Sequence, residues 1–416
     1  MKKHFISILF LLFFTLGASA QYVNLSAELR PRLENRQGYK SLLAEDQEAA
    51  SFVSQRTRLN LAFTQENLHM GVSLQNVRVW GDVSTLAASD KATAFHEAWA
   101  EAILSPALSL KFGRQEIVYD DSRIFGNVGW AQQGRSHDAM LAKFTLDSNR
   151  TLHLGFAMNA DAQTNTKVAY SNAAGYKNFQ YAWYHHKLGR LGMSLLFLNN
   201  GVNYDNDGQQ AVDYSRTFGG RLYYKIGNIT TDFSSYYQGG QLAGNTMNAR
   251  YFSGNLTFRP RAGVSLKLGT EYLSGKDMND TSSEVKSFVP LYGTNHKFNG
   301  WMDYFYVGNH GGSVGLLDVY GTLAFKTGKF SASMTPHFFS SAADVYRGTE
   351  KLESRLGTEL DFSLGYKLSK DIQCNAGYSR MYATDSMEVL QGGDKDSGNQ
   401  WAWLMITFKP TLFSNN

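Results

Sequence analysis

Four arginines near the start of the chain are spaced so that their side chains share one face of two extended segments. Arg30 and Arg32 follow Glu28 in the first segment, and Arg56 and Arg58 stand two residues apart in the second. Residues two apart on a strand point to the same side. A row of guanidinium groups can bind carboxylates through paired hydrogen bonds. The spacing therefore predicts either a path for an anion or a ladder of internal ion pairs.

A second concentration of charged side chains lies between residues 111 and 138, where the regular alternation of the chain breaks off. Such a break is typical of a long loop, and we expect this loop to fold into the barrel interior and form a constriction. Its arginines could bind carboxylates bidentately, and its acids could hold those arginines in place. A purely structural network that anchors the loop explains the same residues, so both interpretations stay open. The basic candidates are Lys111, Arg114, Arg123 and Arg135, and the supporting candidates are Glu116, Asp121, Trp130 and Asp138.

The same segment gives little support to catalysis. Ser136, His137 and Asp138 are adjacent, and neighbours on a strand point to opposite faces, so they cannot easily form a proton relay. The histidines show no metal-ligand spacing on one element. The acidic motifs at 205–208 and 394–398 lack the last acid of a calcium loop. We therefore expect no catalytic residue, no metal and no cofactor.

The elements that would position these side chains are strands with one apolar and one polar face. Apolar and polar residues alternate in the segments 264–272 and 355–366, and similar stretches recur along almost the whole chain. Lipid on one side of a strand and water on the other impose this pattern on transmembrane β-barrels. The four arginines at 30, 32, 56 and 58 then face the water-filled interior, because an arginine facing lipid at mid-bilayer costs about 2–4 kcal/mol.

Short turns and long loops alternate between the strands. Together they predict an all-β fold, a transmembrane antiparallel up-and-down β-barrel of about eighteen strands, with short periplasmic turns and long extracellular loops. The last strand, 400–409, should pair with the first and remove the sheet edges. The predicted turns are 64–67, 105–107, 147–150, 187–190, 225–228, 259–263, 326–329 and 368–371, and the predicted loops are 33–50, 81–94, 113–136, 160–178, 199–214, 238–248, 274–315, 340–354 and 384–399.

Aromatic residues gather where strands approach the short turns. Amphipathic rings belong at the headgroup level, so we interpret them as an interfacial girdle. The ordinary preference of strands for aromatic residues is the alternative explanation. The set comprises Phe63, Phe144, Trp183, Tyr184, Tyr223, Tyr224, Phe258, Phe325, Phe330, Tyr366 and Phe408.

The N-terminus predicts where the protein goes. Lys2 and Lys3 precede an apolar run at 6–16, and Ala18-Ser19-Ala20 supplies a small-residue cleavage site. These are the parts of a secretory signal peptide at 1–20, which leaves 21–416 as one outer-membrane barrel domain. No other apolar run is long enough for a transmembrane helix, which needs about 20 residues.

Net charge sets limits on the partners. The formal net charge of +4 falls to +2 once Lys2 and Lys3 are removed. That is too weak to attract a nucleic acid in bulk, so we expect no nucleic-acid partner. Any charge selectivity must come from the local placement of arginine and lysine.

Several motifs in this chain resemble those of the alginate-export porin family. The central ones are Gly113-Arg114-Gln115-Glu116, Asp121-x-Arg123-x-x-Gly126, Trp130 and Gly134-Arg135-Ser136-x-Asp138-Ala139. Fragments at 29–34, 54–59, 77–81 and 401–410 are similar to that family too. The resemblance implies a monomeric eighteen-stranded outer-membrane barrel whose basic pore conducts an anionic uronic-acid polysaccharide. Arg114, Arg123, Arg135, Glu116 and Asp138 match motif positions of the family.

Three functional hypotheses follow. The first is a channel in the outer-membrane bilayer that passes an anionic sugar polymer, or another small anionic solute, through an arginine- and lysine-lined interior. The alternatives to it are a general porin for small solutes and, as the second hypothesis, a non-conducting surface receptor or adhesin in which the 274–315 loop binds a partner. The third, a barrel hydrolase, would need a serine and a histidine to meet in space. Conductance separates the first hypothesis from the second.

Overall fold

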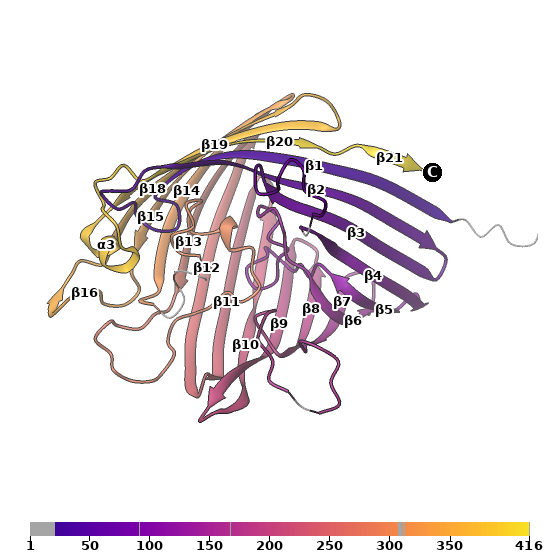
Figure 1. Cartoon of the computed structure of the whole chain (residues 1–416), viewed down its shortest axis with the longest axis horizontal. Helices are drawn as coiled ribbons and strands as arrows, with labels where there is room; N and C mark the ends of the chain where they lie inside the picture. The colour runs from indigo at the N-terminus through magenta and orange to yellow at the C-terminus, as the bar shows by residue number, and fades with distance from the viewer. Residues whose placement is uncertain (1–20, 91, 167, 307–309, 311–312, 416) are drawn as a thin grey trace, which may run out of the picture.

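Each strand pairs antiparallel with its neighbours in sequence, all the way round a closed ring (Figure 1). This computed structural model describes residues 21–415 except 91, 167, 307–309 and 311–312. In that part, nineteen strand segments form one sheet. Segments β20 and β21 lie end to end along β1 and make one interrupted strand, so the barrel has eighteen strands. The predicted fold class is confirmed.

The barrel strands are joined by short turns at one end and longer connections at the other. Two further strands form a small hairpin within one loop, and the described residues include two short helices in the loops. The strand bounds are β1 Tyr22–Gln37, β2 Ala50–Gln65, β3 Leu68–Val79, β4 Thr93–Ser105, β5 Leu108–Gln115, β6 His137–Thr145, β7 Arg150–Met158, β8 Asn178–Leu188, β9 Leu191–Asn206, β10 Gln209–Ile226, β11 Ile229–Leu242, β12 Asn245–Arg261, β13 Val264–Leu273, β14 Leu316–Thr327, β15 Phe330–Ser340, β16 Tyr346–Arg347, β17 Glu350–Lys351, β18 Arg355–Lys367, β19 Ile372–Ala383, β20 Gln400–Phe408 and β21 Thr411–Ser414, and the helices are η1 Asn295–Lys297 and α3 Asp385–Gln391.

The first and last strands close the ring. Gln37 lies opposite Gln400 and Leu29 opposite Phe408 in the β1–β20 pair. Past the break, Leu25 lies opposite Phe413 of β21. Pro410 has no N–H to donate, but its carbonyl still accepts a hydrogen bond from the amide of Ala27 at 3.1 Å. Closure leaves no open edge in the bilayer, where an unpaired backbone group would cost several kcal/mol.

All eight predicted short turns are confirmed, but two of the predicted long loops are wrong. The segments 199–214 and 238–248 are tight hairpins instead, since β9 runs to Asn206 and β11 to Leu242. Asp207 and Gly208 form one turn and Ala243 and Gly244 the other, all with positive φ, as two-residue hairpins require. These strand ends have two polar faces, so the alternation that marks a strand disappears there.

The girdle prediction is confirmed for some aromatic residues and wrong for others. Phe258, Phe325 and Tyr366 lie exposed on the outward face beside the short turns. Trp183 instead faces the interior, where its ring stacks on that of Tyr119 with centroids 4.6 Å apart. Tyr223 also shares the inward face of its strand, two residues from Arg221, which pairs with Asp232.

Inward-facing glycines lie directly opposite inward-facing aromatic residues on the next strand. In each pair the ring lies so close to the glycine that an added Cβ would meet ring atoms at 2.1–2.5 Å. The glycine therefore provides the floor on which the ring rests, and the ring covers the exposed backbone. The pairs are Gly71 with Trp99, Gly155 with Tyr181, Gly192 with Tyr223, Gly269 with Tyr320 and Gly377 with Trp403.

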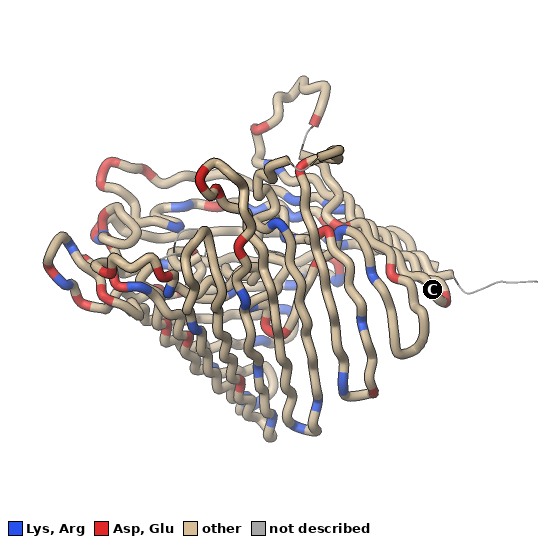
Figure 2. The backbone as a smooth tube through the Cα atoms, turned by 90° about the horizontal axis from the view of Figure 1, so that it is seen from below, with Lys and Arg blue, Asp and Glu red and all other residues tan. Residues whose placement is uncertain are grey.

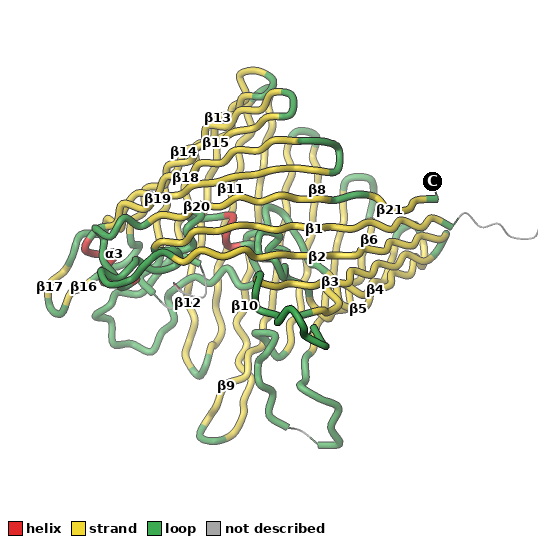
Figure 3. Tube along the Cα trace, turned by 45° about the horizontal axis from the view of Figure 1, so that its top comes forward, coloured by secondary structure: helices red, strands yellow, loops and turns green. Residues whose placement is uncertain are grey.

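Two long connections turn into the ring of strands rather than away from it. They are the loops 116–136 and 274–315, and Figure 3 shows loop segments, in green, within the yellow ring. Inward folding was predicted for the first loop, and it is observed. The receptor hypothesis made the second loop a surface binding element, yet its segment 291–299 packs against the first loop inside the barrel. Within the described residues, no helix has the length and apolar character needed to cross a membrane.

The glycine–aromatic pairs generate a stability prediction. Gly155→Val should push Tyr181 off the wall and lower the free energy of unfolding by about 1–3 kcal/mol, the usual cost of overpacking. Gly254→Val is the matched control, because a Cβ at Gly254 meets nothing within 4 Å. Urea unfolding of the refolded barrel in detergent micelles, followed by gel mobility, measures both. Equal midpoints for the two variants would contradict the prediction.

Candidate functional site

The arginines of β1 hold the loop 116–136 against the barrel wall. Arg30 donates hydrogen bonds to the carbonyls of Gly129 at 2.8 Å, Trp130 at 3.1 Å and Ala131 at 3.2 Å. Arg32 donates to the carbonyl of Trp130 at 2.8 Å, and its guanidinium lies 4.1 Å from the centre of that indole ring. Both arginines are buried. Backbone carbonyls thus accept hydrogen bonds from the guanidinium groups of Arg30 and Arg32, which the sequence suggested as anion ligands.

Acids on the same wall pair with the neighbouring arginines. Arg56 forms an ion pair with Glu28. Glu34, fully buried, accepts hydrogen bonds from Arg32 at 2.8 Å and from Arg36 at 2.9 and 2.8 Å. These contacts are the internal ladder that the sequence left open as one interpretation of the row.

Arg58 is held less tightly than the other arginines of the row. Its Nε donates to Gln75 at 2.7 Å, and its nearest acid, Glu116, lies 3.9 Å away. Glu116 itself accepts hydrogen bonds from His96 at 2.8 Å and Asn127 at 2.7 Å. Burial acts to raise the pKa of Glu116, but these hydrogen bonds outweigh it and hold the pKa below its usual value. Glu116 therefore stays ionised beside Arg58.

Lys111 also faces the interior without an acid close by. Its ammonium group lies 3.7 Å from the ring centre of Trp99, a cation–π contact. Lys143, on the next strand, forms the ion pair with Glu101 at 2.9 Å. Among the described residues, Lys111 has no carboxylate within 4 Å.

Arg114 and Asp138 do not join this cluster. They pair with each other at 2.8 Å, and the Asp138 side chain is exposed while that of Arg114 is partly exposed. Their strands alternate so that Phe112 and Met140 share their face, and both of these are exposed on the outer wall. Arg114 was expected to bind a solute inside the barrel, but it lies on the outward face and does not reach the interior.

Arg123 joins the two inward loops to the strand wall. Its Nη2 lies 2.9 Å from Glu271 of β13 and 2.9 Å from the amide oxygen of Asn299 in the second loop. Its guanidinium packs 4.5 Å from the ring centre of Phe298. Arg123 and Glu271 are both almost fully buried. The sequence singled out Arg123 but gave it a loop acid as partner, whereas Asp121 only accepts the backbone amide of Arg123 at 3.1 Å.

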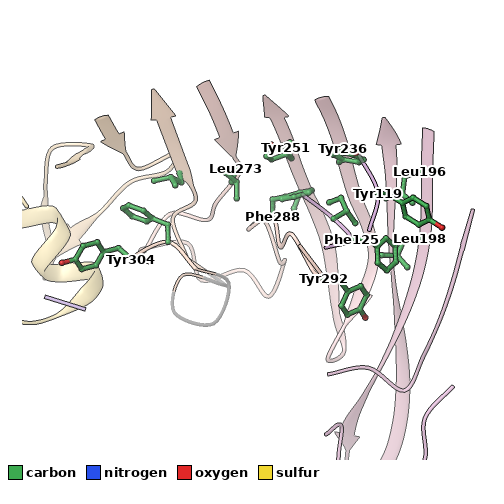
Figure 4. Close-up of a cluster of buried hydrophobic side chains, with 14 of the residues drawn as sticks. Tyr119, Phe125, Leu196, Leu198, Tyr236, Tyr251, Leu273, Phe288, Tyr292 and Tyr304 are labelled. Atoms are coloured by element: carbon green, nitrogen blue, oxygen red, sulfur yellow. The ribbon is translucent and has the colours of Figure 1, made fainter. Parts of the chain in front are cut away.

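Backbone hydrogen bonds continue the junction between the two loops. The amide of Gly126 donates to Tyr292 at 2.8 Å, and the amide of Tyr292 donates to Ile124 at 3.1 Å. Arg135 donates to the carbonyl of Gly293 at 2.9 Å. Phe125 stacks on Tyr292 with ring centroids 5.5 Å apart. Figure 4 shows Phe125 beside Leu198 of β9, so the loop pair also packs on the strands.

Acids on three strands, β13, β14 and β18, hold the second loop against the wall. The amide of Trp301 donates to Asp361 at 3.2 Å, and that of Met302 to Glu359 at 2.8 Å, both acids on β18. Asn299 donates to Glu271 at 3.0 Å and to Asp318 at 3.2 Å. These buried acids were not among the site residues predicted from the sequence. The alternation of their strands places them on the polar face, and that position was the signal that could have identified them.

The loop after β1 completes the arrangement at the long-loop end. Tyr39 donates a hydrogen bond to Asp303, and His296 lies 2.7 Å from the same carboxylate. Burial and the adjacent Asp303 raise the pKa of Tyr39 well above its usual value, so it remains a donor. Trp130 stacks on His296 at 4.9 Å. The loop after β1, the loop 116–136 and the loop 274–315 thus meet around Trp130.

Two cavities lie on either side of the loop segment 127–133. One, of about 540 Å³, is lined by Arg32, Arg36, Tyr39 and Trp130 and opens toward the long loops. The other, of about 490 Å³, is lined by Arg56, Arg58, Glu97, Trp99 and Lys409 and lies toward the short turns. The row of arginines therefore borders both cavities, and the loop segment separates them.

The hydrolase hypothesis needs a serine and a histidine to meet in space. His137 bonds through Nδ1 to Tyr176 at 3.0 Å, whereas the Ser313 hydroxyl lies 3.1 Å from Nδ1 of the buried His310. Nε2 of His310 lies 3.1 Å from the carbonyl of Gly315, and among the described residues no acid lies within 4 Å of its ring nitrogens. Within the described residues, no group of three or more histidine, cysteine or acidic side chains could hold a metal ion. The 205–208 motif is a hairpin turn, in which Asp205 accepts the amide of Gly208 at 2.8 Å.

The buried Arg123–Glu271 pair generates the second prediction. Arg123→Met should leave Glu271 buried without a partner, which costs about 3–5 kcal/mol, and should loosen both loops. Hydrogen exchange at 122–126 and 291–295 measures the loosening, and the double variant Arg123→Met/Glu271→Leu should restore part of the protection. Arg150→Gln, which breaks an exposed turn pair with Asp147, is the control and should change little. Unchanged exchange in Arg123→Met would contradict the prediction.

Comparison with known proteins agrees with this geometry. The family model described as alginate export matches residues 21–399. No curated protein sequence matches the chain. Three similar solved structures are the porin OccK3 (OpdO) of Pseudomonas aeruginosa (14% identity, TM-score 0.64, covering 94% of this chain and 96% of the other), a BenF-like porin of Pseudomonas fluorescens Pf-5 (14%, 0.63, 94% and 99%), and OpdK of P. aeruginosa with vanillate (10%, 0.62, 93% and 98%). At these identities the structures speak for the fold, and the family match identifies the chain. The protein belongs to the alginate-export family and is an outer-membrane β-barrel of the porin type.

Proposed function

We propose that the barrel passes small anionic solutes that carry carboxylates, along the wall formed by β1, β2 and β3. The observation that carries the proposal is the arginine row, which borders the cavities on both sides of the segment 127–133. An anion leaving one cavity meets the guanidinium groups of the next. Binding at each step must stay weak for the solute to move on.

The size of the cavities favours a small solute over a polymer. At about 540 and 490 Å³, each lies within the range of small-molecule sites, about 300–1,000 Å³. A uronic-acid polymer would need one continuous path, and the segment 127–133 would have to leave Arg30 and Arg32. A short uronate or an aromatic acid fits without that. The similar OpdK structure carries vanillate, an aromatic carboxylate.

A basic ring at the periplasmic mouth supports the same charge preference. Five consecutive turns, from β8 to β19, each carry lysine or arginine, with Asp371 as their lone acid in the sequence, and Figure 2 shows blue positions at the tips of short turns. Among the described residues none of these bases has a carboxylate within 4 Å. Strand phase places several of them inward, such as Lys225, two residues from Tyr223. The ring comprises Lys187, Arg190, Lys225, Arg259, Arg261, Lys326, Lys329, Lys367 and Lys370.

The receptor hypothesis keeps one specific observation in its favour. The loops 116–136 and 274–315 are hydrogen-bonded to each other and to several strands of the wall. A plug of that kind would suit a surface receptor that conducts nothing.

Single-channel recording of the refolded barrel across a salt gradient tests the proposal. Anion-selective current that galacturonate or vanillate reduces is the expected result. A correctly folded barrel without current would overturn the channel proposal and leave the receptor. Current that prefers cations would overturn the charge assignment.

The third prediction locates the selectivity. Arg58→Gln and Lys111→Gln should each lower the ratio of anion to cation permeability by about threefold or more, because a unit charge about 7 Å from an ion in water contributes ~0.6 kcal/mol for either ion. The effect should fade above 0.1 M salt, where the Debye length falls below about 10 Å. Arg114→Gln, on the outer wall, should leave the reversal potential unchanged. An equal shift in Arg114→Gln would refute the proposed path.

A further inference from the structure

Two arginines lie on the outer wall of the barrel and take no part in the channel interior. Arg216 of β10 and Arg250 of β12 are exposed, whereas their strand neighbours Ser215, Thr217, Ala249 and Tyr251 are buried and face the interior. Alternation therefore turns both guanidinium groups toward the surrounding membrane.

The two side chains flank a single strand. Arg216 lies opposite Gly239 of β11, Gly239 opposite Asn248 of β12, and Arg250 opposite Tyr237 of β11. Two strand spacings separate β10 from β12, about 10 Å. Gly239 projects no side chain between them, and the ring of Tyr237 lies over it, since a Cβ at Gly239 would meet that ring at 2.8 Å. A ligand that both guanidinium groups reach therefore lies on the Tyr237 ring over β11.

The apolar outer wall ends at these arginines. On β10 the outward positions run Ile226, Tyr224, Leu222, Gly220 and Phe218 before Arg216, and on β12 Phe258, Leu256, Gly254 and Phe252 precede Arg250. Ten residues tilted by about 40° rise about 26 Å, the height of the apolar band of an outer-membrane barrel, which is about 25 Å. The arginines therefore stand at the headgroup level of the outer leaflet, where an outward charge costs little.

Their charges are not neutralised by the protein. Other outward arginines near the same rim have partners in the protein: Arg78 pairs with Asp90 and Arg114 with Asp138. Arg380 of β19 has no acid within 4 Å among the described residues, but its guanidinium lies 5.2 Å from the ring centre of Tyr382. In the part of the chain that the structure describes, Arg216 and Arg250 have no carboxylate within 4 Å. An anion from outside the protein is the missing partner.

We propose that Arg216 and Arg250 bind the phosphate groups of a phosphorylated glycolipid in the outer leaflet, with its acyl chains along Phe218, Leu222 and Phe252. Guanidinium groups match phosphate oxygens bidentately. The rings of Tyr214 and Tyr237 beside them offer the amphipathic surface that suits a sugar headgroup at the interface. This site is separate from the channel and stands whether or not the barrel conducts.

Native mass spectrometry of the refolded full-length barrel, titrated in detergent with bisphosphorylated lipid A, tests the proposal. The wild type should retain lipid A, and Arg216→Gln/Arg250→Gln should weaken its binding at least tenfold. Arg216→Lys/Arg250→Lys should fall between, because lysine keeps the charge but loses the fork. Arg114→Gln is the matched control at a paired rim arginine and should bind like wild type.

The comparison lipids define the outcomes that overturn the assignment. The wild type should bind phosphatidylglycerol at least tenfold more weakly than lipid A. It should bind lipid A without phosphates no better than the double variant binds intact lipid A. Equal binding of phosphatidylglycerol would refute the glycolipid as the ligand. Wild-type affinity in the double variant, with its heat-modifiable gel mobility intact, would refute the two arginines as the site.

Discussion

The structure depends on one constraint, which is that loop backbone inside the barrel needs hydrogen-bonding partners. Loops carry amide and carbonyl groups that no strand ladder satisfies. Inward side chains of the strands supply the partners, with Arg30 donating to carbonyls of the loop 116–136 and Glu359 accepting an amide of the loop 274–315. Charges on the wall and loop backbone in the interior therefore require each other. An apolar inner wall could not hold either loop in place.

Some features of this fold can be predicted from the sequence and others cannot, and contact with lipid decides which. Alternation over residues that touch lipid is strong, so the strands, the eight turns and the inward face of Arg30 and Arg32 follow from it. Where strands leave the bilayer, both faces meet water and the signal vanishes, which is why the β9–β10 hairpin was mistaken for a loop. Trp183 was misplaced because a ring beside a turn has the same sequence pattern whichever face it occupies.

Partners across the interior were the least predictable feature. Arg123 was singled out, but its partner Glu271 lies far away in sequence on β13. Proximity along the chain favoured Asp121, and nothing in one sequence shows which strand a loop will meet. The missed acids had a signal of their own, since Glu271, Glu359 and Asp361 occupy polar-face positions inside apolar strands. A buried charge in such a position needs a partner, and only an inward loop can bring one.

Arginine has different roles at different depths of this barrel, and the surroundings decide which. Inside, Arg30 is buried and donates its hydrogen bonds to loop carbonyls, so it holds the loop in place and has few donors left for a solute. Arg58 and Lys111 keep looser contacts: the nearest acid to Arg58 lies 3.9 Å away, and Lys111 rests on the ring of Trp99. At the periplasmic mouth the bases stand in open water, where screening limits their reach to about a Debye length. The interior therefore separates into positions whose donors hold the loops and positions whose donors the loops leave available, and the proposed selectivity rests on the second group.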